Sequence, residues 1–224
     1  NLGSLTFAGG AVAITENSST TLAGANTATS LILTSTGAMD DGSAATLSVT
    51  GNANFQAGAN AISLDNTASH NLGSLTFAGG AVAITENSST TLAGANTATS
   101  LILTSTGAMD DGSAATLSVT NNANFQAGAN AITLDNATSH NFGTLTFVGG
   151  AVAITENSAM TLAGTNTATA LTLTSAGVMD DGATSTLVVT GNANLQAGAN
   201  AISLDNAASH NLGSLTFAGG AVAI

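Results

Sequence analysis

The sequence predicts an all-β protein with the architecture of a β-solenoid, a right-handed parallel β-helix in which short strands stack coil upon coil. Three observations predict this fold. The chain repeats a 70-residue unit without gaps, each unit contains short runs that alternate apolar with small polar residues, and Gly, Asn or Asp separates the runs. No segment has the apolar stripe of 3.6-residue spacing, bounded by capping residues, that predicts a helix.

The 70-residue unit organises the whole chain. The units span 1–70, 71–140 and 141–210, and residues 211–224 begin a fourth, all within one continuous solenoid. The second unit differs from the first at four positions, and the third differs from the first at 16. Each position is therefore sampled three times, and the differences between copies serve as an internal comparison.

Eight short runs of the first unit are predicted as strands, at residues 4–7, 11–15, 20–23, 30–34, 38–39, 46–50, 54–56 and 61–64. The turns that carry acidic residues follow one another at intervals of 24, 24 and 21 residues. A coil of about 20 to 26 residues closes once per interval, which gives about three coils per repeat, paired in parallel roughly 4.8 Å apart.

Large apolar residues two positions apart identify the inward face of each predicted strand, because alternate side chains of a strand share a face. The pairs are Leu5 and Phe7, Val12 and Ile14, Leu31 and Leu33, Leu47 and Val49, and Ile62 and Leu64. Ile32 lies between two inward residues and becomes Thr172 in the third repeat, so the outer face is predicted for it.

The charge of the chain excludes several functions. It has 12 acidic residues, no Lys or Arg, and a formal net charge of −12. Without cationic side chains it is not expected to bind nucleic acid, nor an anionic membrane surface, and no insertion into a membrane is expected. The absence of Cys excludes disulfides and thiol chemistry.

The carboxylates are the candidate binding residues. We expect them at one corner of successive coils, where an acidic edge without basic partners suits calcium, a cation that prefers oxygen ligands. The alternative is that they are solvated turn residues that keep a fibre soluble. The candidate calcium ligands are Glu16, Asp40, Asp41, Asp65, Glu86, Asp110, Asp111, Asp135, Glu156, Asp180, Asp181 and Asp205.

Catalysis is not expected. A hydrolytic site needs one set of carboxylates in a groove, whereas here the set recurs in every repeat and has no cationic partner. The histidines, His70, His140 and His210, are expected to be exposed turn residues too far apart to share a metal ion. We therefore predict no catalytic residue and no cofactor-binding residue, and calcium is the only cofactor considered.

The repeats resemble the shafts of filamentous haemagglutinin-like bacterial surface proteins. The resemblance covers the whole chain and rests on the segments LTF, LILT, TLSVTGNANFQAGANAISLDN and GGAVAI. Those proteins are large right-handed β-helical adhesins, exported through an outer-membrane partner. The resemblance implies an extracellular or cell-surface location, a structural and non-catalytic role, and a host or neighbouring cell surface as partner.

Two alternatives remain open. Near-identical units also suit a sheath, an S-layer-like polymer or another extracellular filament, in which the chain associates with itself end to end or laterally. A calcium-dependent binding module, using the acidic edge, is the other alternative.

Overall fold

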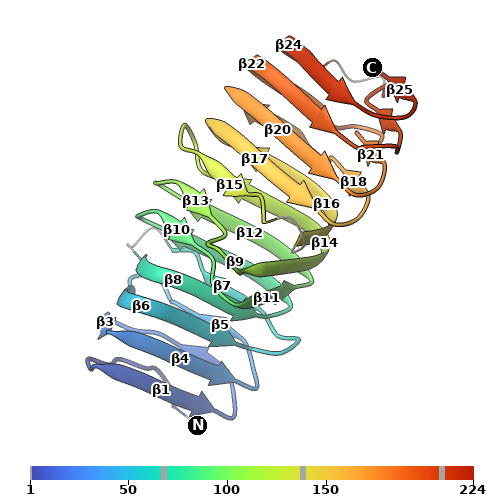
Figure 1. The fold of residues 1–224 in the computed structure, drawn as a ribbon. Helices are drawn as coiled ribbons and strands as arrows, with labels where there is room; N and C mark the ends of the chain where they lie inside the picture. The colour runs from blue at the N-terminus through green and yellow to red at the C-terminus, as the bar shows by residue number, and fades with distance from the viewer. Residues whose placement is uncertain (1, 67–69, 137–139, 207–209) are drawn as a thin grey trace.

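The chain forms a rod of stacked coils, with the N-terminus at one end and the C-terminus at the other (Figure 1). The computed structural model describes residues 2–66, 70–136, 140–206 and 210–224, and these contain strands but no helix. Neighbouring strands pair in parallel, and they complete about ten turns. The predicted all-β solenoid is therefore confirmed. Nothing in the described ranges is a helix long and apolar enough to span a membrane.

The strands recur with the repeat. The first eight are β1 (Ala11–Glu16), β2 (Thr20–Thr21), β3 (Ala25–Ala28), β4 (Ser30–Ser35), β5 (Met39–Asp40), β6 (Thr46–Gln56), β7 (Ile62–Leu64) and β8 (His70–Ala78). The next eight are β9 (Ala81–Glu86), β10 (Thr90–Thr91), β11 (Ala95–Ala98), β12 (Ser100–Ser105), β13 (Met109–Asp110), β14 (Thr116–Gln126), β15 (Ile132–Leu134) and β16 (His140–Val148). The last nine are β17 (Ala151–Glu156), β18 (Met160–Thr161), β19 (Thr165–Ala168), β20 (Ala170–Ser175), β21 (Met179–Asp180), β22 (Thr186–Gln196), β23 (Ile202–Ser203), β24 (Asn211–Ala218) and β25 (Val222–Ala223).

Three strands make one coil. After β1, β2 and β3 the chain returns, and β4 pairs with β1 so that Leu31 lies on Val12. The long strands β6 and β8 each serve two sides of the rod. The first part of β6 pairs with β3 and its second part with β4, and the ladder between β6 and β8 shifts register between Val49 and Asn52.

A repeat therefore contains ten strand segments, because β6 and β8 each count as two. Three segments make one coil, so a repeat makes three coils and one additional segment. The consequence appears in the columns of stacked residues. Val12 lies in a column with Leu31 and Ala53, but Val82, its counterpart in the second repeat, pairs with Ile62. The column of Ile62 leads back through Met39 to Thr20 on β2. Successive repeats are thus related by a screw rotation of about 120° around the axis of the rod, with a rise of about 16 Å along it at the usual strand spacing.

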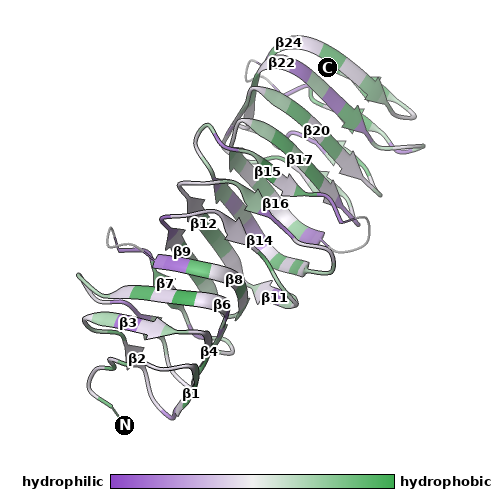
Figure 2. Cartoon of the chain, turned by 60° about the vertical axis from the view of Figure 1, so that its left-hand side comes forward, coloured by the Kyte–Doolittle hydropathy of each residue, from purple (hydrophilic) through white to green (hydrophobic). Residues whose placement is uncertain are grey.

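The core is a narrow column of apolar side chains between the sides of the rod. Leu33, Phe55 and Phe77 pair in register on successive coils, and all three are fully buried. Along the strands hydropathy alternates as the inward and outward faces require (Figure 2). Ile32 is 49% exposed between the buried Leu31 and Leu33, which confirms the predicted faces. In the first coil Phe7, Val12 and Ile14 are only partly buried and pack against the core from its end.

Candidate functional site

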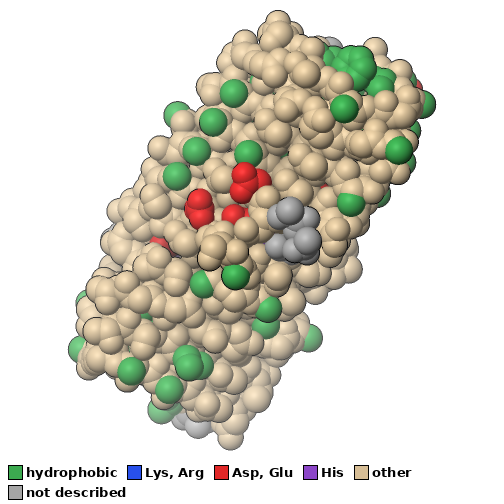
Figure 3. All heavy atoms as spheres, viewed as in Figure 1, with side chains coloured by type: hydrophobic (Ala, Val, Ile, Leu, Met, Phe, Trp, Pro, Cys, Tyr) green, Lys and Arg blue, Asp and Glu red, His purple; other side chains and the backbone are tan. Residues whose placement is uncertain are grey.

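The twelve carboxylates fall into two groups that the sequence does not distinguish. Six are buried, namely Glu16, Asp41, Glu86, Asp111, Glu156 and Asp181. The other six are exposed, namely Asp40, Asp65, Asp110, Asp135, Asp180 and Asp205. The face drawn in Figure 3 accordingly shows a few acidic side chains gathered near its middle and scattered apolar ones elsewhere.

The expected single acidic edge is wrong, because the extra strand of each repeat turns the sites around the rod. Asp40 pairs with Ser63 on the next coil, and Asp65 follows that strand, so these two share a corner. Glu16 instead pairs with Ser35 at the end of β1, on another side of the rod. The corner of Asp40 and Asp65 is completed by Glu86 of the next repeat, at the end of β9, which pairs with β7.

Asp41 forms a buried pair with His70 at this corner. The Nε2 atom of His70 lies 2.6 Å from the Oδ2 atom of Asp41, and the N–H of Asn66 donates to the same oxygen at 3.1 Å. The pair recurs as Asp111 with His140 and as Asp181 with His210, in each case at 2.7 Å. Each Asp thus binds residues on both sides of a three-residue segment, 67–69, 137–139 or 207–209, that lies outside the described residues.

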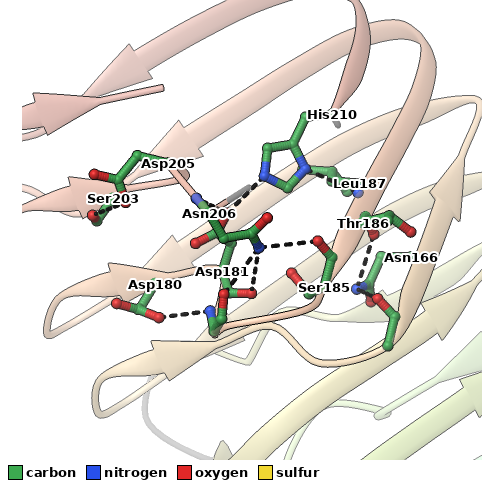
Figure 4. Close-up of polar contacts among 12 residues, drawn as sticks. Asn166, Asp180, Asp181, Ser185, Thr186, Leu187, Ser203, Asp205, Asn206 and His210 are labelled. Carbon is green, nitrogen blue, oxygen red and sulfur yellow. Dashed lines mark hydrogen bonds and ion pairs between the residues drawn. The ribbon is translucent and has the colours of Figure 1, made fainter. Parts of the chain in front are cut away.

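The third repeat shows how the imidazole is oriented (Figure 4). The N–H of Leu187 donates to Nδ1 of His210 at 3.1 Å, so in the neutral ring the proton is on Nε2, which faces Asp181. The side-chain amide of Asn206 donates to the carbonyls of Asp181, Gly182 and Ser185 and holds the turn beside the pair. In this repeat both ring nitrogens are engaged within the fold, whereas Nδ1 of His70 and Nδ1 of His140 are buried and have no hydrogen-bond partner among the described residues.

The expectation that the histidines are exposed turn residues is wrong. His70 and His140 are buried, and His210, near the C-terminal end of the rod, is partly buried. The physical reason is the carboxylate of the preceding coil, since Asp and His each make the burial of the other tolerable. A sequence signal was available: histidine is the only basic side chain in the chain, and each one follows its Asp by the same 29 residues.

The three Glu residues serve a second internal role. Oε1 of Glu86 accepts the N–H of Leu72 at 2.9 Å, and Oε1 of Glu156 accepts the N–H of Phe142 at 2.9 Å. Burial raises the pKa of Glu86, and it raises the pKa of Glu156 to about 6. At Glu16, in the first coil, the hydrogen bond from the Leu2 N–H holds the pKa below its ordinary value.

The predicted calcium site requires several oxygen ligands gathered around one point. Within the described ranges no three or more His, Cys, Asp or Glu residues come together as a metal site. Asp40 accepts the N–H of Gly42 and Asp41 is bound to His70. A shallow hollow of about 260 Å³ does lie against this corner, but among its lining residues Asp41 is the one titratable group.

Replacing Asp111 with Asn tests the structural role of the Asp–His pair. The change replaces the carboxylate whose Oδ2 atom accepts hydrogen bonds from His140 and from the N–H of Asn136. Hydrogen bonds to a charged group contribute about 2 kcal/mol, and we expect a loss of that size in chemical denaturation. Asp110→Asn, at the adjacent exposed position, is the control and should have little effect; equal losses in the two variants would contradict the role assigned to the pair.

Comparison with known families finds the same period. The model of a family described as repeats of unknown function (DUF5649) matches residues 9–78, 79–148 and 149–218. The matched segments are consecutive and 70 residues long, and together they cover nearly the whole chain. No curated protein and no solved structure matches the chain.

Proposed function

The chain therefore belongs to the family of repeats of unknown function (DUF5649), and we propose that it is the repetitive shaft of an extracellular fibre or adhesin, without catalytic activity. Its task is mechanical: it separates whatever lies at its two ends by a stiff rod. Length is set by the number of repeats, since each repeat adds the same rise.

The observation that carries this proposal is the ladder that crosses repeat boundaries without interruption. The boundary between the first two repeats lies within β8, where His70 pairs with Leu47 and Asn71 pairs with Ser48. The boundary between the next two lies within β16, where His140 and Asn141 pair in the same way with β14. A ladder of this kind couples neighbouring repeats and resists bending at their junctions.

One feature of composition and one resemblance support a location outside the cell. A chain without Lys or Arg has no bond that trypsin cleaves, which suits a surface exposed to proteases. Its resemblance to the shafts of filamentous haemagglutinin-like adhesins points the same way.

Small-angle scattering of chains with two, three and four repeats tests the shaft. We expect a constant cross-section and a maximum dimension that grows by about 16 Å per repeat. A particle that widens in all directions as repeats are added, or a length that does not increase, would contradict the proposal.

A self-assembling filament is the second candidate. The parallel ladder favours it, because near-identical repeats that pair coil on coil, as β6 pairs with β8 and β14 with β16, present strand edges that another copy can extend in the same way. Sedimentation over a range of concentrations separates the two functions. Association into longer rods at micromolar concentration favours the filament, and a single species with the mass of one chain favours the shaft.

A further inference from the structure

Glu156 is a buried carboxyl group with one unsatisfied oxygen. Its Oε1 atom accepts from the N–H of Phe142 and from the hydroxyl of Ser158, both at 2.9 Å. Its Oε2 atom is buried and has no hydrogen-bond partner among the described residues. The whole residue is 1% exposed. An ionised carboxylate in this position keeps a charged oxygen out of contact with water, which is unfavourable.

The second repeat contains the same buried carboxyl group beside a different residue. There Oε1 of Glu86 accepts from the N–H of Leu72 at 2.9 Å and from the hydroxyl of Ser88 at 3.2 Å, and its Oε2 atom, like the hydroxyl of Thr90, is buried and has no hydrogen-bond partner among the described residues. In the third repeat Met160 takes the place of Thr90. A thioether donates no hydrogen bond, so the residue at this position offers Oε2 of Glu156 no donor.

We propose that Glu156 is a proton-binding site of the folded rod, and that proton uptake there stabilises the third repeat on mild acidification. The proton converts a buried charge into a neutral carboxylic acid, which removes the penalty for burying the ionised form. The chemical species bound is the proton itself, and no other ligand is required.

The surroundings contain few other groups that titrate. On β16 the nearest is His140, whose backbone carbonyl accepts the N–H of Asn157 and whose ring is bound to Asp111. Asp135 follows β15 and is exposed. The strands β18 and β20, which lie on the other sides of β17 and its turn, carry no titratable side chain. Neither His140 nor Asp111 is altered in the variants below, so their contributions cancel in the comparison.

The direction of the pH effect follows from the raised pKa of Glu156, about 6 in the folded rod against an ordinary value of 4.5. Between these two values the folded state binds more protons at this residue than the unfolded state. Its contribution to stability is therefore greatest below pH 4.5, declines as the pH rises through 6, and is lost above that.

Thermal melting at about pH 5 and about pH 7.5, in the same salt, tests the site. For the natural sequence we expect a Tm higher at the lower pH by an amount on the order of 4 °C. Glu156→Gln should reduce that difference, and the remainder is assigned to Glu86, whose pKa burial also raises. Glu16→Gln in the first coil should leave the difference unchanged.

A direct titration guards against a variant that fails to fold. The carboxyl carbon of Glu156 can be followed by NMR in the natural protein and should titrate near pH 6. A midpoint at the ordinary value of 4.5 would overturn the proposal. So would a Tm difference that persists unchanged in Glu156→Gln.

Discussion

Ile84→Asp is expected to lower the free energy of unfolding by about 4 kcal/mol or more, because it replaces a core side chain with a carboxylate that has no partner. Ile84 is 1% exposed and lies on β9, paired with Leu64 of the coil before and Leu103 of the coil after. The chain has no Lys or Arg to neutralise the new charge. Chemical denaturation followed by circular dichroism measures the loss.

Ile102→Asp is the matched control for this prediction. Ile102 lies on β12, in register with Ala83, and its side chain is 49% exposed on the outer face. The same chemical change there leaves the new carboxylate in water, so the loss is expected to stay below about 1 kcal/mol. If both variants lose the same stability, the assignment of inner and outer faces is wrong.

The strand faces could be predicted from the sequence because alternation and repetition give independent information. Leu31 and Leu33 mark one face by their spacing, and the change from Ile32 to Thr172 marks the other by its tolerance of polarity. Burial agrees with both. A local pattern with a period of two is enough to orient a strand, since it depends only on the neighbours in the chain.

The turn between successive repeats could not be predicted in the same way. It depends on whether the number of strand segments in a repeat is a multiple of three. That number is not evident from the sequence, because β6 and β8 each contain a corner of the rod within a continuous strand. Without that count, the nearly equal spacing of the acidic residues predicts one shared edge. It therefore places Glu16 at the corner that Glu86 occupies.

For a related reason, the sequence does not predict which of the acidic residues are buried. Asp40 and Asp41 are adjacent, yet the first is exposed and the second is buried against His70. Which of two neighbours turns inward is decided at the corner by the coil stacked on it, through contacts 25 and 29 residues away. No local pattern reports such contacts.

The corners hidden within long strands depend on glycine. Gly143 lies in the middle of β16, where the strand passes from one side of the rod to the next. A Cβ atom at this position would lie 2.1 Å from the carbonyl oxygen of Thr120 on the coil before. Backbone cannot move aside as a flexible side chain can, so the two coils would have to separate at this corner. Its counterpart Gly3, in the first coil, has open space around the same position.

Gly143→Ala is therefore expected to destabilise the rod by about 3 kcal/mol or more, a large effect for the addition of one methyl group. Gly128→Ala, in the preceding repeat, separates this close approach from the conformational preference of glycine. Gly128 has a φ of +58° and nothing within 4 Å of a Cβ atom, so only its left-handed backbone conformation opposes alanine, at about 1 kcal/mol. Denaturation of both variants in the full chain ranks the two effects. A loss at Gly143 no larger than that at Gly128 would mean that the coils are not packed backbone against backbone at this corner, and the register across the bend of β14 and β16 would have to be revised.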